Sequence, residues 1–372
     1  MFYANFIEKP EIFIRHSSEL SFGGQDVLEM QPGELWMVAR WSAAPAVFAA
    51  GNPAVIRPPL FKSFDNGRVW KSFESLPIDW NVDGICDAGG NSLLRLTSGR
   101  ILFVAHRRSV KYGASGSHGI PVISASDDNG IHWSKPRLML DDEDIIYLMN
   151  QRIVQMSGGR LILPVAGRDP GIPLEIYREG SHACQIRCLI SDDEGDTWRW
   201  SEGILREDTA RGAQEPALLE ASPGVLVMLF RSGNGCHMAS FSTDGGDAWS
   251  VPVRTALTAA CSPLTMLKLP DGRLLVAYNH AEPLFKESYF PRNPLVYATS
   301  RDGHIWSEPT LIDDQPGQQL IYPSITNTSE GLLVVYCACY DAGNGNFSAP
   351  PDAWKTGGGK RSLIKRQAII SS

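Results

Sequence analysis

The sequence lacks the features that mark several classes of protein. No apolar run among its 372 residues is long enough to span a bilayer, so we expect no membrane partner. Basic residues are in deficit, with 34 Lys and Arg against 41 Asp and Glu. A nucleic-acid-binding domain usually has a basic surface, and we therefore expect no nucleic-acid partner. Helical periodicity is also hard to find anywhere along the chain.

Neither the cysteines nor the first residues show a recognisable pattern, whether of disulfides, of a metal site or of a signal peptide. The seven cysteines are odd in number and none has CxxC spacing, so we expect free structural thiols, no metal site and no cofactor. The first residues, MFYANFIEKPEIFIRHS, place Glu8 and Pro10 where a signal peptide has its apolar stretch. We therefore expect a cytoplasmic protein, or one whose leader has been removed.

One short pattern, Ser-x-Asp-x-Gly-x-x-Trp, returns along the chain. The copies are SFDNGRVW (63–70), SDDNGIHW (126–133), SDDEGDTW (191–198), STDGGDAW (242–249) and the shortened SRDGHIW (300–306). The aspartate of such a turn can accept hydrogen bonds from backbone N–H groups of the same turn, and the glycine permits positive φ. Because loops separated by whole units of a repeat cannot converge on one site, we interpret these aspartates as structural, not as calcium ligands or catalytic acids.

A second repeat runs beside the first and reads as strand, glycine turn, strand. Its turn glycines are Gly33, Gly99, Gly159, Gly224, Gly272 and Gly331. In the first five copies a further strand follows and ends in the Asp-containing turn. These units predict an all-β chain, a six-bladed β-propeller that forms a single domain over residues 1–372. A solenoid is the alternative, but the copies vary too much in length to stack in a straight column.

The sixth copy lacks the Asp-containing turn, which a closed ring explains. We expect its third strand to be SLIKRQAII at the C-terminus and its fourth to be EIFIRHS near the N-terminus. Pairing of the N- and C-terminal strands would close the propeller and leave no blade edge unpaired.

The five turns are Asp boxes, and the chain resembles the sialidase superfamily, in particular its BNR-repeat branch, over essentially its whole length. In that family the Asp boxes lie on the face opposite the active site. The strand order predicts the same arrangement, because a turn after the third strand lies at the end opposite the start of the first strand. Counting back nine residues from the turn glycines, with an adjustment in the fifth copy, places these residues at the site end: Gly24, Gly90, Asn150, Glu215, Cys261, Ser262 and Tyr322.

The resemblance assigns roles to residues in three segments. AQEPALLEASPGVLVMLFRSG resembles the segment with a catalytic glutamate and an active-site arginine, here Glu215 and Arg231. FPRNPLVYATSRDG is similar to the stretch with another substrate-binding arginine, here Arg292, and LIYPSITNTSEGLLVVY resembles the segment with the nucleophilic tyrosine, here Tyr322. In sialidases the arginines bind the substrate carboxylate, the tyrosine attacks the anomeric carbon, and the glutamate acts as its base.

Two departures from the family pattern concern the first blade. The family usually has Arg-Ile-Pro there, whereas this chain has FGGQDVLEM, with Gly24 or Gln25 in place of the arginine. The next loop, WSAAPAVFAAGNPAVIRPPLFK, contains no carboxylate to act as the acid/base residue. We expect Asp87 to replace the proton donor, and Arg152 and Arg40 to complete the cationic cluster. The other candidates for the proton donor are Asp26, Asp169, His106 and His118. The other candidates for the cationic cluster are Arg57, Arg107 and Arg108.

The resemblance implies an exo-acting glycoside hydrolase that removes a terminal acidic sugar, sialic acid or a related one, by a retaining mechanism with a tyrosine nucleophile. The expected partner is a glycan or a small sugar. One alternative is a propeller that binds glycans without catalysis, and another is a hydrolase or lyase that acts on a different sugar. A protein-interaction propeller is a further alternative, and it predicts no convergent charges at the mouth of the central channel.

Overall fold

In the part of the chain that it describes, the computed structural model has 26 strands. The structure describes residues 3–6, 11–14, 22–41, 58–73, 75–79, 92–108, 119–140, 146–147, 152–168, 184–284, 286, 291–316, 318–340 and 361–371. Within these ranges no residue is helical, so this part of the chain offers no helix that could cross a membrane.

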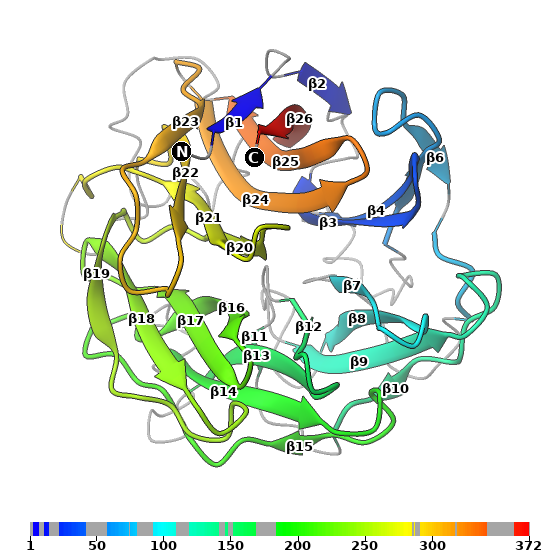
Figure 1. Cartoon of the computed structure of the whole chain (residues 1–372), viewed down its shortest axis with the longest axis horizontal. Coiled ribbons are helices and arrows are strands. Elements are labelled where there is room, and N and C mark those ends of the chain that lie inside the picture. The colour runs from blue at the N-terminus through cyan, green and yellow to red at the C-terminus, as the bar shows by residue number, and fades with distance from the viewer. Residues whose placement is uncertain are drawn as a thin grey trace, which may run out of the picture.

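The strands form five hydrogen-bonded sheets that are arranged as a β-propeller (Figure 1). Three of the sheets have four antiparallel strands in sequence order. These strands are β3 (Phe22–Gln31), β4 (Glu34–Trp41), β5 (Leu60–Ser63) and β6 (Lys71–Phe73); β16 (Gln214–Ser222), β17 (Val225–Arg231), β18 (Cys236–Ser242) and β19 (Val253–Thr258); and β20 (Thr265–Lys268), β21 (Leu274–Asn279), β22 (Leu295–Ser300) and β23 (Thr310–Asp313).

A fourth sheet has nine strands where the repeats predict two separate units. Its strands are β7 (Ser92–Arg95), β8 (Ile101–Arg108), β9 (Gly119–Ser126), β10 (Arg137–Leu138), β11 (Ile146–Tyr147), β12 (Val154–Gln155), β13 (Leu161–Arg168), β14 (Cys184–Ser191) and β15 (Arg199–Trp200). The short strand β11 joins the two halves, because Ile146 pairs with Gly119 of β9 and with Gly167 of β13. On either side of it, β7–β10 and β12–β15 keep the strand order of the four-stranded sheets.

The fifth sheet contains both ends of the chain. Its strands are β1 (Tyr3–Phe6), β2 (Glu11–Ile14), β24 (Gln318–Thr328), β25 (Gly331–Tyr340) and β26 (Arg361–Ser371). The C-terminal strand β26 pairs with β25 and with both N-terminal strands, so that Ile12 lies opposite Ile364 and Ala4 lies opposite Ile370. The pairing of β2 with β26 is the one that the sequence predicts, whereas β1 is an additional strand.

Each Asp box follows the third strand of its unit and is held together by hydrogen bonds within the turn. The serine hydroxyl donates to the aspartate carboxylate at 2.7–3.0 Å and accepts the glycine N–H at 2.8–3.0 Å. The tryptophan indole N–H donates to the glycine carbonyl at 2.9–3.1 Å. The bonds stay within each turn, so the Asp boxes are local clasps, as the sequence predicts.

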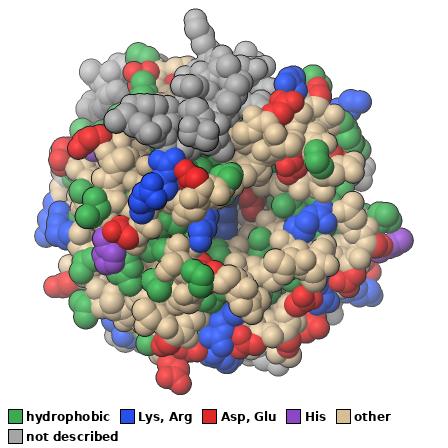
Figure 2. Space-filling view, in the orientation of Figure 1, with side chains coloured by type: hydrophobic (Ala, Val, Ile, Leu, Met, Phe, Trp, Pro, Cys, Tyr) green, Lys and Arg blue, Asp and Glu red, His purple; other side chains and the backbone are tan. Residues whose placement is uncertain are grey.

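The first strand of each unit lies nearest the central axis. Going around the ring in Figure 1, these inner strands are β3, β7, β12, β16, β20 and β24. The space-filling view shows a hollow near the middle of the molecule, with acidic and basic side chains at its edge (Figure 2). The Asp boxes lie beside the hairpin turns that end the inner strands, since the N–H of Asn66 donates to the carbonyl of Gly33 at 3.0 Å. The starts of the inner strands are therefore at the opposite end of the ring.

The core lies between neighbouring sheets. Leu35 and Met37 of β4, for example, are completely buried in one cluster with Leu333 and Val335 of β25. Each such side chain contributes roughly 1.5–3 kcal/mol when it is removed from water. This packing between sheets fixes the inner strands around the axis and so determines which of their first residues can meet.

Candidate active site

Glu215 is the second residue of the inner strand β16 and Tyr322 is the fifth residue of the inner strand β24, and both lie on β-bulges. Their φ angles are 41° and 52°, and the pairing with the next strand changes register around each of them. A non-glycine residue in this conformation costs of the order of 1–3 kcal/mol, and a bulge changes the direction of a side chain. Both lie nine residues before a turn glycine, Gly224 or Gly331, so the unusual backbone occurs at the predicted level.

Glu215 and Arg231 form a buried ion pair. Arg231 ends β17, and its Nη1 lies 2.7 Å from Oε2 of Glu215. Arg231 is only 4% exposed and Glu215 only 2% exposed. The second carboxylate oxygen of Glu215, Oε1, is buried and has no hydrogen-bond partner in the described part of the protein. Because buried polar atoms are nearly always paired, this oxygen has the capacity to accept one more hydrogen bond.

Cys261 and Tyr322 complete the surroundings of Arg231. The Nε–H of Arg231 donates to Sγ of Cys261 at 3.2 Å, and Cys261 lies in the segment before β20. Burial by itself would lower the pKa of Arg231, but the negative charges that Cys261, Glu215 and Tyr322 can carry raise it above its usual value. The guanidinium therefore stays charged, and it interacts electrostatically with Tyr322.

A second ion pair lies at the start of β3. Nη1 of Arg152, two residues before β12, is 3.2 Å from Oδ1 of Asp26. The same carboxylate accepts the backbone N–H groups of Val27 at 3.0 Å and of Leu93 at 2.9 Å. The pKa of Asp26 is raised, because the effect of burial outweighs the opposing effects of Arg152 and of the two N–H groups. The structure thus joins two residues that the sequence analysis gives to different roles.

Gln25 connects the two ion pairs. Its Nε2 donates to the carbonyls of Tyr322 at 2.8 Å and of Val335 at 2.7 Å, and its Oε1 accepts from the thiol of Cys337 at 3.3 Å. The main-chain carbonyl of Gln25 accepts a long hydrogen bond, 3.5 Å, from Nη2 of Arg152. Gln25 is, with Gly24, one of the two residues that the sequence analysis puts in place of the family's arginine, and its side-chain NH₂ group binds the protein backbone.

The backbone of Arg292 lies beside the start of β24. Its carbonyl accepts from Nδ2 of Asn279 at 3.0 Å and from the N–H of Leu320 at 2.9 Å. Its N–H donates to Oε1 of Gln319 at 2.8 Å. Leu320 is two residues before Tyr322, so the segment that carries Arg292 adjoins the strand that carries the predicted nucleophile.

For most of the other predicted residues the structure describes the backbone alone or does not describe the residue. Arg40 lies in β4, and His106, Arg107 and Arg108 lie in β8, where the structure describes the backbone. The predicted residues outside the described part of the chain are Arg57, Asp87, Gly90, His118, Asn150 and Asp169. The contact of Cys261 with Arg231 was not predicted, because no local pattern marks a cysteine that meets an arginine from another sheet.

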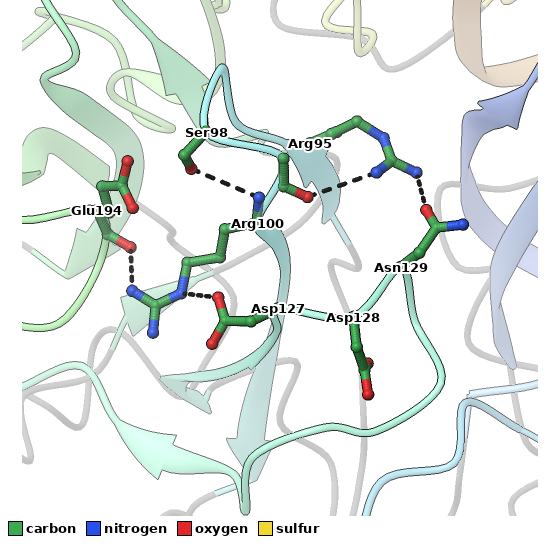
Figure 3. A pocket seen from close by; sticks show the side chains of 8 residues that line it. Arg95, Ser98, Arg100, Asp127, Asp128, Asn129 and Glu194 are labelled. Carbon is green, nitrogen blue, oxygen red and sulfur yellow. Dashed lines mark hydrogen bonds and ion pairs between the residues drawn. The ribbon is translucent and has the colours of Figure 1, made fainter.

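A cavity of about 440 Å³ lies away from this cluster, at neighbouring Asp boxes (Figure 3). Its lining residues are Arg95, Ser98, Gly99, Arg100, Asp127, Asp128, Asn129 and Glu194. Arg100 is 3.1 Å from Asp127 and 3.0 Å from Asp196, and Arg95 donates to Asn129 at 2.7 Å. Because these charged groups bind one another, we interpret the cavity as a groove between two clasps and assign no chemistry to it.

Comparison with known sequences identifies a family. The family model described as "BNR repeat-like domain" matches residues 87–335, which is more than half of the 372 residues. No curated protein matched the sequence.

Several solved structures share the fold. A protein of unknown function from Dyadobacter fermentans has a TM-score of 0.69 at 17% identity, and the match covers 98% of both chains. A Hadza microbial sialidase has a TM-score of 0.63 at 18% identity, covering 99% of this chain and 68% of its own. Trypanosoma rangeli sialidase, in a complex with 2,3-difluorosialic acid described as a covalent intermediate, has a TM-score of 0.63 at 14% identity, covering 98% of this chain and 59% of its own. At these identities the likeness shows the fold alone.

Proposed function

Since the chain belongs to the BNR repeat-like family, we propose that it is a glycoside hydrolase of sialidase type that removes a terminal acidic sugar from a glycan. The observation that carries the proposal is the cluster around Arg231. It combines a buried carboxylate from Glu215, which keeps one oxygen without a partner in the described part of the chain, with the phenol of Tyr322. These are the parts that a retaining reaction with a tyrosine nucleophile requires.

The proposal includes a ring of six blades in one domain. In this interpretation the nine-stranded sheet counts as two blades, β7–β10 and β12–β15, which β11 connects at their edges. The sheet that contains β1, β2 and β26 then closes the ring by joining the chain ends. Six inner strands would surround the axis, and their first residues would line the upper mouth of the channel.

In the proposed first step, Oη of Tyr322 attacks the anomeric carbon while the bond from this carbon to the leaving oxygen breaks. Oε1 of Glu215 takes the phenolic proton, which is needed because a phenol ordinarily ionises near pH 10. An acid gives a proton to the leaving oxygen, and Asp87 is the candidate from the sequence. The fixed positive charge of Arg231 favours the phenolate form of Tyr322.

The second step reverses these transfers. Water attacks the anomeric carbon, the bond from this carbon to Oη of Tyr322 breaks, and Glu215 returns the proton to the phenolate. The residue that served as the acid, now ionised, takes the proton of the water. The sugar leaves with its original anomeric configuration, because two displacements have occurred.

The test is a screen of 4-methylumbelliferyl glycosides of acidic and neutral sugars. We expect the wild type to release the fluorophore from an acidic sugar and Tyr322→Phe to reduce kcat by at least about 10³-fold. Tyr278→Phe is the matched control, because Tyr278 is a buried tyrosine whose hydroxyl bonds to Nδ1 of His280 at 3.1 Å. Equal turnover by wild type and Tyr322→Phe would overturn the mechanism.

A glycan-binding protein without catalysis is the second candidate. The observation in its favour is Gln25, whose amide donors bind backbone carbonyls at the place where the family has an arginine. Binding of an acidic sugar by both wild type and Tyr322→Phe, with no turnover by either, would favour this candidate.

A further inference from the structure

We propose that Arg152, held in position by Asp26, is an additional anion-binding residue of this site and replaces the arginine that the first inner strand lacks. The inference rests on the proposed function, and it specifies which residues select a carboxylate-bearing sugar. Arg152 belongs to the third inner strand in sequence order, not to the first, so the anionic group of the substrate would bind on a different side of the mouth.

The geometry places the guanidinium of Arg152 on the channel side of the ring. Strand β7 lies between β3 and β12 around the axis (Figure 1). Leu93 of β7 donates its N–H to Asp26, and Ser92 of β7 accepts the N–H of Ile153 at 3.2 Å. An ion pair that joins β3 to the start of β12 must therefore pass over the inner end of β7, which faces the axis.

The cationic member of this pair faces solvent and the anionic member lies behind it. The side chain of Arg152 is 20% exposed, whereas that of Asp26 is 4% exposed and that of Arg231 is 5% exposed. A guanidinium carries five N–H donors, and the described contacts of Arg152 use one with Asp26 and one, at 3.5 Å, with Gln25. The remaining donors form the planar fork that matches two carboxylate oxygens.

Asp26 is suited to positioning and poorly suited to donating a proton. Both of its oxygens accept backbone N–H groups, one from Val27 and one from Leu93, and one also meets Arg152. A general acid must present its proton to the leaving oxygen in the open part of a site. We therefore assign Asp26 to fixing the direction of Arg152 and remove it from the candidates for the acid.

The anion-binding position lies within reach of the predicted nucleophile. Gln25 accepts a hydrogen bond from Arg152 through its carbonyl and donates one to the carbonyl of Tyr322 through its side chain. One residue thus separates the guanidinium from the backbone of Tyr322. A sugar acid whose carboxylate binds Arg152 can place its anomeric carbon near that strand.

The experiment compares substrates that differ only in the carboxylate. In 4-methylumbelliferyl β-D-glucuronide a carboxylate replaces the CH₂OH group of the β-D-glucoside, and the N-acetylneuraminide serves as the larger acidic substrate. The variants are Arg152→Gln, which removes the charge, Arg152→Lys, which keeps the charge but loses the fork, and Asp26→Asn, which removes the support. Arg95→Gln, at the Asp-box end, is the matched control. Free glucuronic acid, N-acetylneuraminic acid and glucose are the probes for binding by calorimetry.

We expect Arg152→Gln to lower kcat/KM for the acidic substrates about 10–100-fold, mostly through KM, and to lower any turnover of the glucoside much less. Arg152→Lys should recover part of the loss, and Asp26→Asn should lower the acid preference without abolishing turnover. Arg95→Gln should behave as wild type. If Asp26→Asn does not fold, the two Arg152 variants alone test whether Arg152 binds the carboxylate of the substrate.

The outcomes separate this inference from the proposed function. Turnover that depends on Tyr322, with an acid preference unchanged in Arg152→Gln, would overturn the inference and leave the hydrolase in place. Binding of a free sugar acid that weakens in Arg152→Gln, in a protein without turnover, would support the inference and overturn the hydrolase. Equal loss for acidic and neutral sugars would make Arg152 a structural residue only, and absence of binding to any sugar acid would overturn both proposals.

Discussion

The variant Arg231→Met distinguishes two roles of the Glu215–Arg231 ion pair. The pair either stabilises the folded protein or serves the reaction. Methionine retains an unbranched apolar stem of similar length, but it leaves the carboxylate of Glu215 without its counter-ion. It also removes the donor to Cys261, which lies 3.2 Å from Nε of Arg231. The perturbation acts first on the buried group around Arg231, which includes Glu215, Cys261 and Tyr322.

The burial of the pair sets the size of the effect. The two side chains are 5% and 1% exposed, for Arg231 and Glu215, so little solvent screens them. Removing one partner of a buried pair costs about 3–5 kcal/mol in the free energy of unfolding. Replacing both partners by apolar residues is often neutral or stabilising by about 1–4 kcal/mol. We therefore expect Glu215→Leu with Arg231→Met to recover nearly all the stability that Arg231→Met loses.

The assay is urea denaturation of the wild type, both single variants and the double variant, followed by tryptophan fluorescence. Lys135→Met is the control, because Lys135 lies 3.5 Å from Asp79 with both side chains more than half exposed, and it should change the free energy of unfolding by less than about 1 kcal/mol. A loss below about 1 kcal/mol for Arg231→Met, or a double variant less stable than either single variant, would refute the reasoning. A stable but inactive double variant would mean that the pair is retained for function.

Two further predictions concern backbone strain and acid stability. The free energy of unfolding of Glu215→Gly should exceed that of Glu215→Ala by about 1 kcal/mol, as measured by thermal melting. The reason is that φ is 41° at this position and glycine adopts this conformation without strain. A more stable alanine variant would contradict the assigned bulge. The N–H and side chain of His132 lower the pKa of Asp128 to about 2, so the stabilisation is present above about pH 4 and is lost as the pH falls towards 2. The difference in urea midpoint between wild type and Asp128→Asn should therefore be larger at pH 5 than at pH 2.5, and an equal difference at both would contradict it.

The sequence predicts those parts of the fold that depend on turn chemistry at fixed offsets. The five Asp boxes form the predicted clasps because serine, aspartate, glycine and tryptophan bind within a few residues of one another. The offset of nine residues before the turn glycine identifies Glu215 and Tyr322, because the bulge lies at the same distance from the turn in both hairpins.

The parts that were not predicted depend on contacts between distant segments. Strand β11 joins two units through Ile146, and nothing in its two residues distinguishes it from a loop. Asp26 and Arg152 both appear among the sequence candidates, but their pairing depends on where β7 places the two strand ends. Such contacts follow from the packing of whole sheets, so local patterns do not reveal them.

The most direct test of the central claim is the mass of the intact protein and its peptides after incubation with the fluorinated analogue of the acidic sugar that the wild type cleaves. A tyrosine nucleophile predicts one sugar adduct per chain on the peptide that contains Tyr322, and no adduct on Tyr322→Phe. Turnover without an adduct on Tyr322, or an adduct on a different side chain, would contradict it.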